Sequence, residues 1–194
     1  MNPLMRKLEF SDQSFRGLAL DGTVLSDREF YDCEFETSAF TGMEWTGSLF
    51  DACRFRGCRL SLVGLSRVQF RGVVFTGCKL SGINFSAMDG LGLEMGFQDC
   101  ELAGCTFSGL DLRGLRIRDC RVTGCDFVST RLDGADLQGS DFLDSLFQET
   151  SLVKADLRAA RNFAIHPLNN PIKGARFSLP EALSLLSGLE IRLD

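Results

Sequence analysis

The sequence predicts an all-β solenoid because three columns of residues repeat with a period of five. Large apolar residues occupy a central column, and this spacing matches neither an α-helix, with 3.6 residues per turn, nor one long strand, with two. Small or apolar residues lie two positions before each central residue, and most of the 20 glycines lie two positions after it. A unit of one short extended piece and one tight corner cannot bury its apolar residues alone, so successive units must coil and stack.

The central column supplies the predicted core. It begins at Phe10, continues at every fifth residue to Phe85, and resumes two residues out of phase from Phe97 to Leu157. Every phenylalanine up to residue 159 belongs to it. Because alternate side chains of an extended segment point to opposite sides, the central residue and the residue two positions earlier are both expected to face inward. The aromatic residues expected in the core are Phe35, Phe55, Phe75, Phe107, Phe127 and Phe147.

All eight cysteines lie in the column two positions before the centre. If one coil comprises 20 residues, paired cysteines stack in adjacent coils at about 4.8 Å, farther apart than the ~3.8 Å between Cβ atoms that a disulfide prefers. We therefore expect buried free thiols and no metal site, since the only histidine, His166, lies outside the repeat. The pairs that are 20 residues apart are Cys33 with Cys53, Cys58 with Cys78, Cys100 with Cys120 and Cys105 with Cys125.

Five segments, ADLQG, ADLRA, SDFLD, CDFVS and INFSA, resemble the pentapeptide-repeat motif A(D/N)LXX. The resemblance covers about residues 8 to 159 and holds across all three columns. It implies a right-handed quadrilateral β-helix of about seven coils, with four five-residue sides per coil. The expected organisation is a β-helix over residues 1–159 and a C-terminal segment over residues 160–194.

Residues 86–96 interrupt the repeat, and two interpretations remain open. Continuing either frame places a glycine, Gly90 or Gly92, at a central position, so the coil must contain a bulge or a short projecting loop. The segment is either a tolerated insertion or a loop that contacts a partner through Met88, Asp89 and Glu94.

The C-terminal segment predicts a short α-helix over residues 179–187. Ser178 and Glu181 form a capping box before it. The helix would cover the open end of the last coil, which otherwise exposes unpaired backbone groups. It is either a monomeric cap or the interface of a homodimer, and the family resemblance favours the dimer. The interface stripe would consist of Leu179, Leu183 and Leu186.

Composition and motifs argue against several function classes. An apolar run long enough for a membrane span or a secretory leader is missing, so we expect a soluble cytoplasmic protein. A net charge of −5 argues against direct binding of nucleic acid. No combination of nucleophile, base and acid indicates an enzyme, so we assign no catalytic residue and no cofactor.

Charges form bands along the chain. Residues 52–88 contain no acid but carry Arg54, Arg56, Arg59, Arg67, Arg71 and Lys79. The acids of residues 27–51 are Asp27, Glu29, Asp32, Glu34, Glu36, Glu44 and Asp51. The acids of residues 126–156 are Asp126, Asp133, Asp136, Asp141, Asp144, Glu149 and Asp156.

Stacking at a 20-residue step predicts which charges meet. Glu34 would lie beside Arg54, and a ladder would alternate Glu101, Arg121 and Asp141. Such exposed pairs contribute only ~0 to 1 kcal/mol each. Asp136 and Asp156 would stack like charge on like charge, an arrangement suited to an external cation or a basic partner.

The sequence resembles pentapeptide-repeat proteins of the Qnr, MfpA and AlbG type in its size, its single interruption and its ending RFSLPEALSLL. This resemblance implies a rod-shaped homodimer that imitates duplex DNA, binds DNA gyrase or a topoisomerase, and protects it from poisons of the quinolone or albicidin type. Dimerisation through the C-terminal end would place the acids of residues 126–156 beside the centre of the rod. The alternative is a structural scaffold that binds a different protein.

Overall fold

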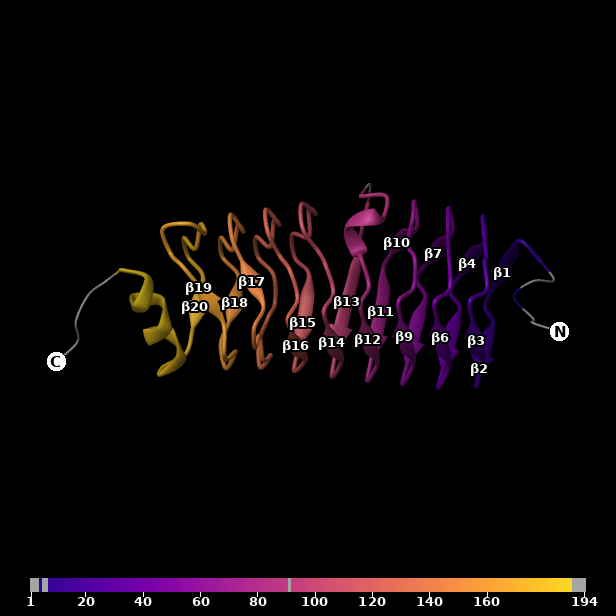
Figure 1. Cartoon of the computed structure of the whole chain (residues 1–194), viewed down its shortest axis with the longest axis horizontal. Helices are drawn as coiled ribbons and strands as arrows, with labels where there is room; N and C mark the ends of the chain where they lie inside the picture. The colour runs from indigo at the N-terminus through magenta and orange to yellow at the C-terminus, as the bar shows by residue number, and fades with distance from the viewer. Residues whose placement is uncertain (1–3, 5–6, 91, 190–194) are drawn as a thin grey trace.

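The protein is an all-parallel β-solenoid of about 8 turns, a right-handed quadrilateral β-helix, and the predicted fold class is confirmed. The structure, a computed structural model, describes residues 4, 7–90 and 92–189. The coils stack along one axis, with the first coil and the C-terminal helix at opposite ends of a rod (Figure 1). Parallel pairing continues past Leu157 to Ile165 and Phe177, which is why the rod has more coils than the expected seven.

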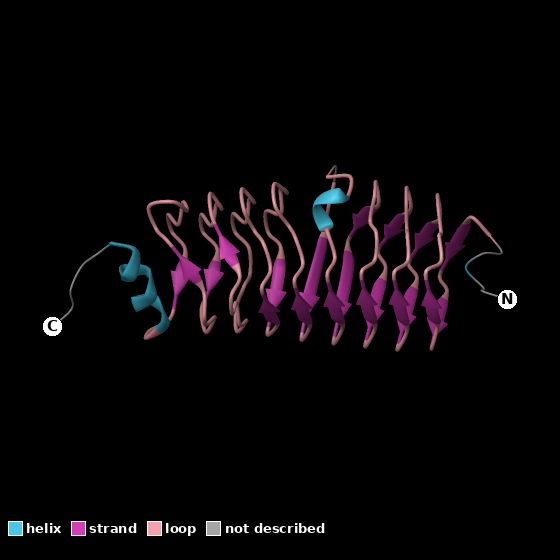
Figure 2. Ribbon diagram, in the orientation of Figure 1, coloured by secondary structure: helices cyan, strands magenta, loops and turns pink. Residues whose placement is uncertain are grey.

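Three of the four sides of the rod carry parallel sheets of four, six and six strands, all of which end before the C-terminal coils (Figure 2). The first sheet contains β1 (Glu9–Ser11), β4 (Glu29–Tyr31), β7 (Leu49–Asp51) and β10 (Gln69–Arg71). The second contains β2 (Ser14–Arg16), β5 (Glu34–Glu36), β8 (Arg54–Arg56), β11 (Val73–Thr76), β13 (Met95–Gln98) and β15 (Arg116–Arg118). The third contains β3 (Ala19–Asp21), β6 (Ala39–Thr41), β9 (Arg59–Ser61), β12 (Lys79–Ser81), β14 (Glu101–Ala103) and β16 (Arg121–Thr123).

The fourth side and the C-terminal coils are joined mainly by isolated bridges. On the fourth side, Thr106 bridges both Asn84 and Asp126. The short strands of the last coils are β17 (Leu146–Phe147), β18 (Asp156–Leu157), β19 (Ala164–Ile165) and β20 (Arg176–Phe177). They pair β17 with β19 and β18 with β20.

The last coil keeps the register although its sequence pattern changes. Ile165 lies opposite Phe147, two residues short of a full 20-residue step, whereas Phe177 lies opposite Leu157 at the full step. A turn before Asn170 adds two residues to this coil, so the step between Thr150 and Asn170 is again 20 residues. The buried amide of Asn170 then accepts from the Thr150 N–H at 2.9 Å, where earlier coils place a small side chain. The apparent end of the repeat in the sequence is therefore a local change of coil length.

The central column forms ladders of stacked aromatic rings inside the rod. The centroids of Phe35 and Phe55 are 4.6 Å apart, and those of Phe107 and Phe127 are 5.0 Å apart at an interplanar angle of 2°. The structure places all the expected core aromatics at 4% exposure or less. Burial at this level makes each ring a large contributor to stability, and it holds neighbouring coils in register.

The eight cysteines are buried and free of disulfide bonds. The backbone N–H groups of Cys58, Cys78 and Cys100 each donate to the sulfur in the next coil at 3.3–3.4 Å. Two of the expected pairs thus join across the interruption into one column that ends at Cys120. Hydrogen bonds to neighbouring thiols and burial raise the pKa of Cys78 and Cys120, so these groups stay protonated and act as small apolar side chains.

The interruption contains a single turn of 3-10 helix, η2 (Phe85–Ala87), which projects from the rim of the rod (Figure 1). Met88 is 7% exposed and belongs to the core, so it is not available to a partner. The Asp89 N–H donates to the Val68 carbonyl at 3.0 Å, and the Asp89 carboxylate accepts from Gln69 at 3.2 Å. Glu94 is exposed. Of the three residues expected on a partner-contacting loop, only Glu94 is freely presented to solvent.

The C-terminal helix η3 (Glu181–Leu189) has 3-10 geometry where the sequence predicts an α-helix. The hydroxyls of Ser184 and Ser187 donate to the carbonyls three residues earlier, contacts that suit the tighter winding. None of the helices in the described part of the chain is long and apolar enough to span a bilayer.

The outer surface of η3 is apolar at several positions. Leu179, just before the helix, and Leu183 are 76% and 49% exposed, whereas Leu186 is half-buried. Leu185, outside the expected stripe, is the residue that packs against the core.

Candidate protein-binding surface

The outward positions on either side of each central residue carry the charges, and the coil distributes them around the rod. Asp136 and Asp156 lie in one column of the second side and bridge through the backbone. Asp144 and Glu149 occupy corners with left-handed backbone, at φ 56° and 54°. The remaining acids of residues 126–156 lie on the other three sides, so the seven do not form one patch. They are Asp126 on the fourth side, Asp133 on the first and Asp141 on the third.

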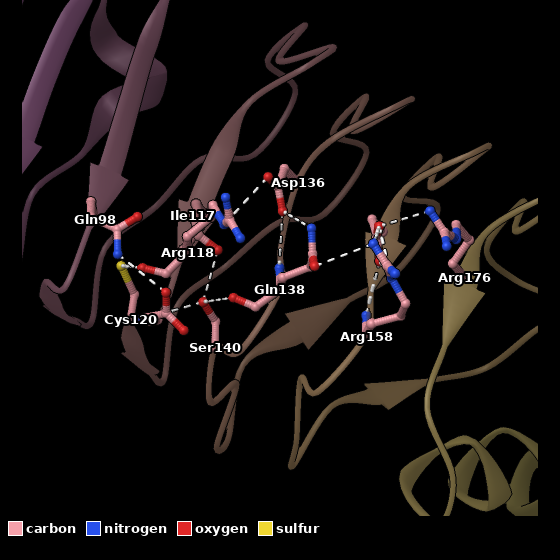
Figure 3. A network of polar contacts seen from close by, with 11 residues as sticks. Gln98, Ile117, Arg118, Cys120, Asp136, Gln138, Ser140, Arg158 and Arg176 are labelled. Atoms are coloured by element: carbon pink, nitrogen blue, oxygen red, sulfur yellow. Dashed lines mark hydrogen bonds and ion pairs between the residues drawn. The ribbon is translucent and has the colours of Figure 1, made fainter.

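The column of Asp136 and Asp156 is neutralised by arginines within the rod. Arg118 lies 3.5 Å from Asp136, and Asp156 is 2.7 Å from Arg158 and 3.4 Å from Arg176. Figure 3 shows these contacts as one network along the second side, in which Gln138 links Asp136 to Arg158. The Arg158 guanidinium holds the pKa of Asp156 below its usual value. The like-charged pair therefore does not require an external cation.

Two further acids of residues 126–156 are also paired. Asp141 receives Arg161 at 2.9 Å and Asn162 at 2.7 Å. Burial raises its pKa, but these hydrogen bonds outweigh burial and lower the pKa overall. Asp133 lies 3.7 Å from Arg131 and accepts from the Ser151 hydroxyl.

Within residues 126–156, all of which the structure describes, the carboxylates without an ion pair are Asp126, Asp144 and Glu149. Asp126 accepts the Val128 N–H at 2.8 Å, and Glu149 accepts from the Ser129 hydroxyl at 3.2 Å. Both remain acceptors for additional donors, because a carboxylate offers about four lone-pair sites. These three groups are the most available negative charges of residues 126–156.

The acids of residues 27–51 are less compensated. Glu34 pairs with Arg56 at 2.5 Å and Glu36 pairs with Arg16. Glu29 stacks beside Glu9 in the first sheet and accepts from the Tyr31 hydroxyl at 2.9 Å. This hydrogen bond raises the pKa of Tyr31. Across the described coils, no ion pair is formed by Asp27, Asp32, Glu44 or Asp51.

The described residues contain no group of three or more histidine, cysteine, aspartate or glutamate side chains able to hold a metal ion. The hollows on the rod are surface depressions, the larger ones of about 460 Å³. His166 uses its Nδ1 to accept the Leu168 N–H at 3.2 Å. The surface of the rod thus consists of shallow depressions between extended charged sides.

Comparisons with known proteins agree with the repeat. A family described as "Pentapeptide repeat region" matches residues 95–165, and one described as "Pentapeptide repeats (8 copies)" matches residues 48–86. Together the two matches cover more than half of the chain. The comparison with curated proteins found no match.

Among solved structures, the rod is similar to QnrB1, a plasmid-mediated fluoroquinolone resistance protein. One trypsin-treated form has 18% identity and a TM-score of 0.68, with 93% of this chain and 100% of that chain covered. A second trypsin-treated form has 17% identity and a TM-score of 0.61, with 96% and 91% covered. At these identities the likeness establishes the fold.

Proposed function

Since the chain belongs to the pentapeptide-repeat family, we propose that it is a non-enzymatic protein that binds DNA gyrase or a related topoisomerase and protects the enzyme from quinolone-type or albicidin-type poisons. The observation that carries the proposal is the correspondence with a fluoroquinolone resistance protein over almost the entire length of both rods. Because the two chains match over nearly their whole lengths, this protein could offer a partner a surface as long as that of the resistance protein.

The proposed partner surface is basic, as expected of a protein that holds duplex DNA. Exposed carboxylates at successive corners of the rod would occupy positions that DNA phosphates otherwise take. The groups suited to this role are those without an ion pair in the described part of the rod, above all Asp144 and Glu149. Complementary charge would steer association, and the association rate should therefore fall with ionic strength.

We further propose that two chains associate through the C-terminal end. Leu179 and Leu183 expose apolar surface beside the last coil, where a second copy would cover them. The acids of residues 126–156 would then flank the centre of a double-length rod. Sedimentation at two protein concentrations tests this, and a 21.4 kDa species throughout would contradict it.

Supercoiling by purified gyrase, with and without a quinolone, tests the proposed function. The chain should change supercoiling directly or restore it in the presence of the drug. The double variant Asp144→Lys, Glu149→Lys should weaken the effect about tenfold or more, because it reverses two unpaired charges. The corner of Lys154, at φ 60°, shows that the coil accepts lysine at such a position.

The matched control is Asp32→Lys, which reverses an equally unpaired corner charge near the N-terminal end, at φ 51°. It should leave protection nearly unchanged if the centre of a dimeric rod is the contact. No effect of the unmodified chain at tens of micromolar would reject the gyrase proposal and leave a scaffold for a different protein. The uncompensated acids of residues 27–51 favour this second function, because they lie far from the proposed dimer centre.

A further inference from the structure

The outer surface of the second sheet supports an inference that is independent of the proposed function. Between β8 and β15 the two outward columns change from charged to uncharged and back. In successive strands, one column contains Arg54, Val74, Gly96 and Arg116. The other column contains Arg56, Thr76, Gln98 and Arg118. The two middle strands thus present no charged side chain, while each end strand presents two arginines.

The middle of this surface is hollow because Gly96 has no side chain. A depression of about 460 Å³ lies over Val74, Gly96 and Arg116, and a second of about 210 Å³ continues from the same residues toward Gly72. Val74 is an apolar side chain with 42% exposure on an otherwise polar side of the rod. We call this surface, from Arg54 to Arg116, the arginine-flanked hollow.

The four arginines differ in their partners. Arg56 is held by Glu34 at 2.5 Å, and Arg118 by Asp136 at 3.5 Å, in each case a carboxylate one coil farther from the hollow. Arg54 and Arg116, by contrast, form no ion pair within the described chain. Each end therefore keeps one guanidinium able to bind an external carboxylate in a bidentate manner.

The spacing of the free arginines matches an extended peptide. Arg54 and Arg116 are three coils apart, about 14 Å at a strand spacing of ~4.8 Å, while residues i and i+4 of an extended chain are ~13 Å apart. We propose that the arginine-flanked hollow binds an extended acidic peptide segment running along the rod, with two acidic residues four positions apart and a small apolar residue midway. The acids would contact Arg54 and Arg116, and the apolar side chain would fill the space above Gly96.

The surroundings favour a short peptide over a polynucleotide. Glu94, an exposed acid without an ion pair in the described chain, lines the smaller depression and would repel a longer, uniformly anionic strand. Single-stranded nucleic acid also prefers aromatic side chains on which bases stack, and the outward residues here are Val74, Thr76 and Gln98.

Fluorescence anisotropy with a labelled, end-blocked peptide Gly-Glu-Ser-Val-Ser-Glu-Gly measures the binding directly. We expect saturable binding below about 100 µM at low salt, and at least about tenfold weaker binding for Arg54→Gln and for Arg116→Gln, because each removes a charge-assisted hydrogen bond. Arg59→Gln is the matched control, since Arg59 is an arginine in the same coil as Arg54 but on the third side.

Gly96→Leu tests the hollow separately from the charges. A Cβ at Gly96 would meet Arg116 at an ordinary 3.7 Å, so the variant should fold while its side chain fills the space. It should also weaken binding about tenfold.

Three outcomes would overturn the proposal. These are no binding at 100 µM, equal binding by the peptide with glutamines in place of its glutamates, and binding that Arg54→Gln and Arg116→Gln leave unchanged. Tighter binding of a labelled oligothymidylate through the same two arginines would assign the surface to nucleic acid instead of peptide.

Discussion

Two acidic regions of similar composition occupy opposite halves of the rod, but they differ in how many of their carboxylates form ion pairs. Residues 27–51 and residues 126–156 each contain seven acids. In the first region only Glu34 and Glu36 form ion pairs, whereas four acids of the second are paired, three of them with arginines from outside that region. The number of acids in a segment therefore does not give the number of uncompensated carboxylates on the surface of a solenoid, because ion pairs between coils neutralise some of them.

The cause of the difference is the position of the arginines relative to the coil step. Arg161 and Arg176 lie 20 residues after Asp141 and Asp156, so stacking brings each arginine beside its acid. In the N-terminal region the step of 20 residues places Glu29 beside Glu9, and Tyr31 beside Asp51. The N-terminal coils therefore carry more carboxylates without an ion pair.

The largest expected effect tests whether the two regions share the same core. Phe35→Ala and Phe127→Ala should each lower the free energy of unfolding by ~3 to 5 kcal/mol, because both rings are buried and stacked on both sides. Urea denaturation measures both values. A gap of more than about 2 kcal/mol between them would mean that the regions differ in packing as well as in charge. Gln138→Ala, on the surface, should change stability by less than ~0.5 kcal/mol.

A smaller effect separates the paired acids from the unpaired ones. Asp156→Asn should destabilise the protein by about 1 kcal/mol, because it weakens hydrogen bonds from Arg158 and Arg176 to a charged acceptor. Asp32→Asn, which removes an acid without an ion pair, should be neutral or slightly stabilising. Thermal unfolding of both variants at low and high salt provides the measurement. Equal effects would remove the distinction between the two regions.

The smallest effect is a dependence of stability on acid pH. The pKa of Asp156, lowered mainly by Arg158, and that of Asp141 lie below the unfolded value of about 3.9. The unfolded chain then binds more protons, so this stabilisation is present above pH ~4 and is lost as the pH falls through the folded pKa. Each group should contribute no more than about 1 kcal/mol. Asp156→Asn should flatten the decline of the unfolding free energy below pH 4, and an unchanged slope would contradict the assignment.

The ion pairs show where sequence-based reasoning ends. The 20-residue step correctly places Glu34 opposite Arg54 in the backbone register, but the Glu34 carboxylate pairs with Arg56. The expected ladder of Glu101, Arg121 and Asp141 also has this register, yet Glu101 pairs with Lys79 and Asp141 with Arg161. Long side chains choose among several neighbours of similar energy, and a register alone cannot rank them.

The sequence by itself determined the coil, because the period of five is a local property. A large inward apolar residue, an inward small or apolar residue and a corner recur from unit to unit, and Phe127 with Cys125 already shows the pattern. Only the tertiary structure decided which positions remain available to a partner. Met88 entered the core, Phe177 joined the register of Leu157, and the acids of residues 126–156 acquired arginines. These outcomes depend on contacts between residues about 20 positions apart, whose energies are set by the stacking of whole coils.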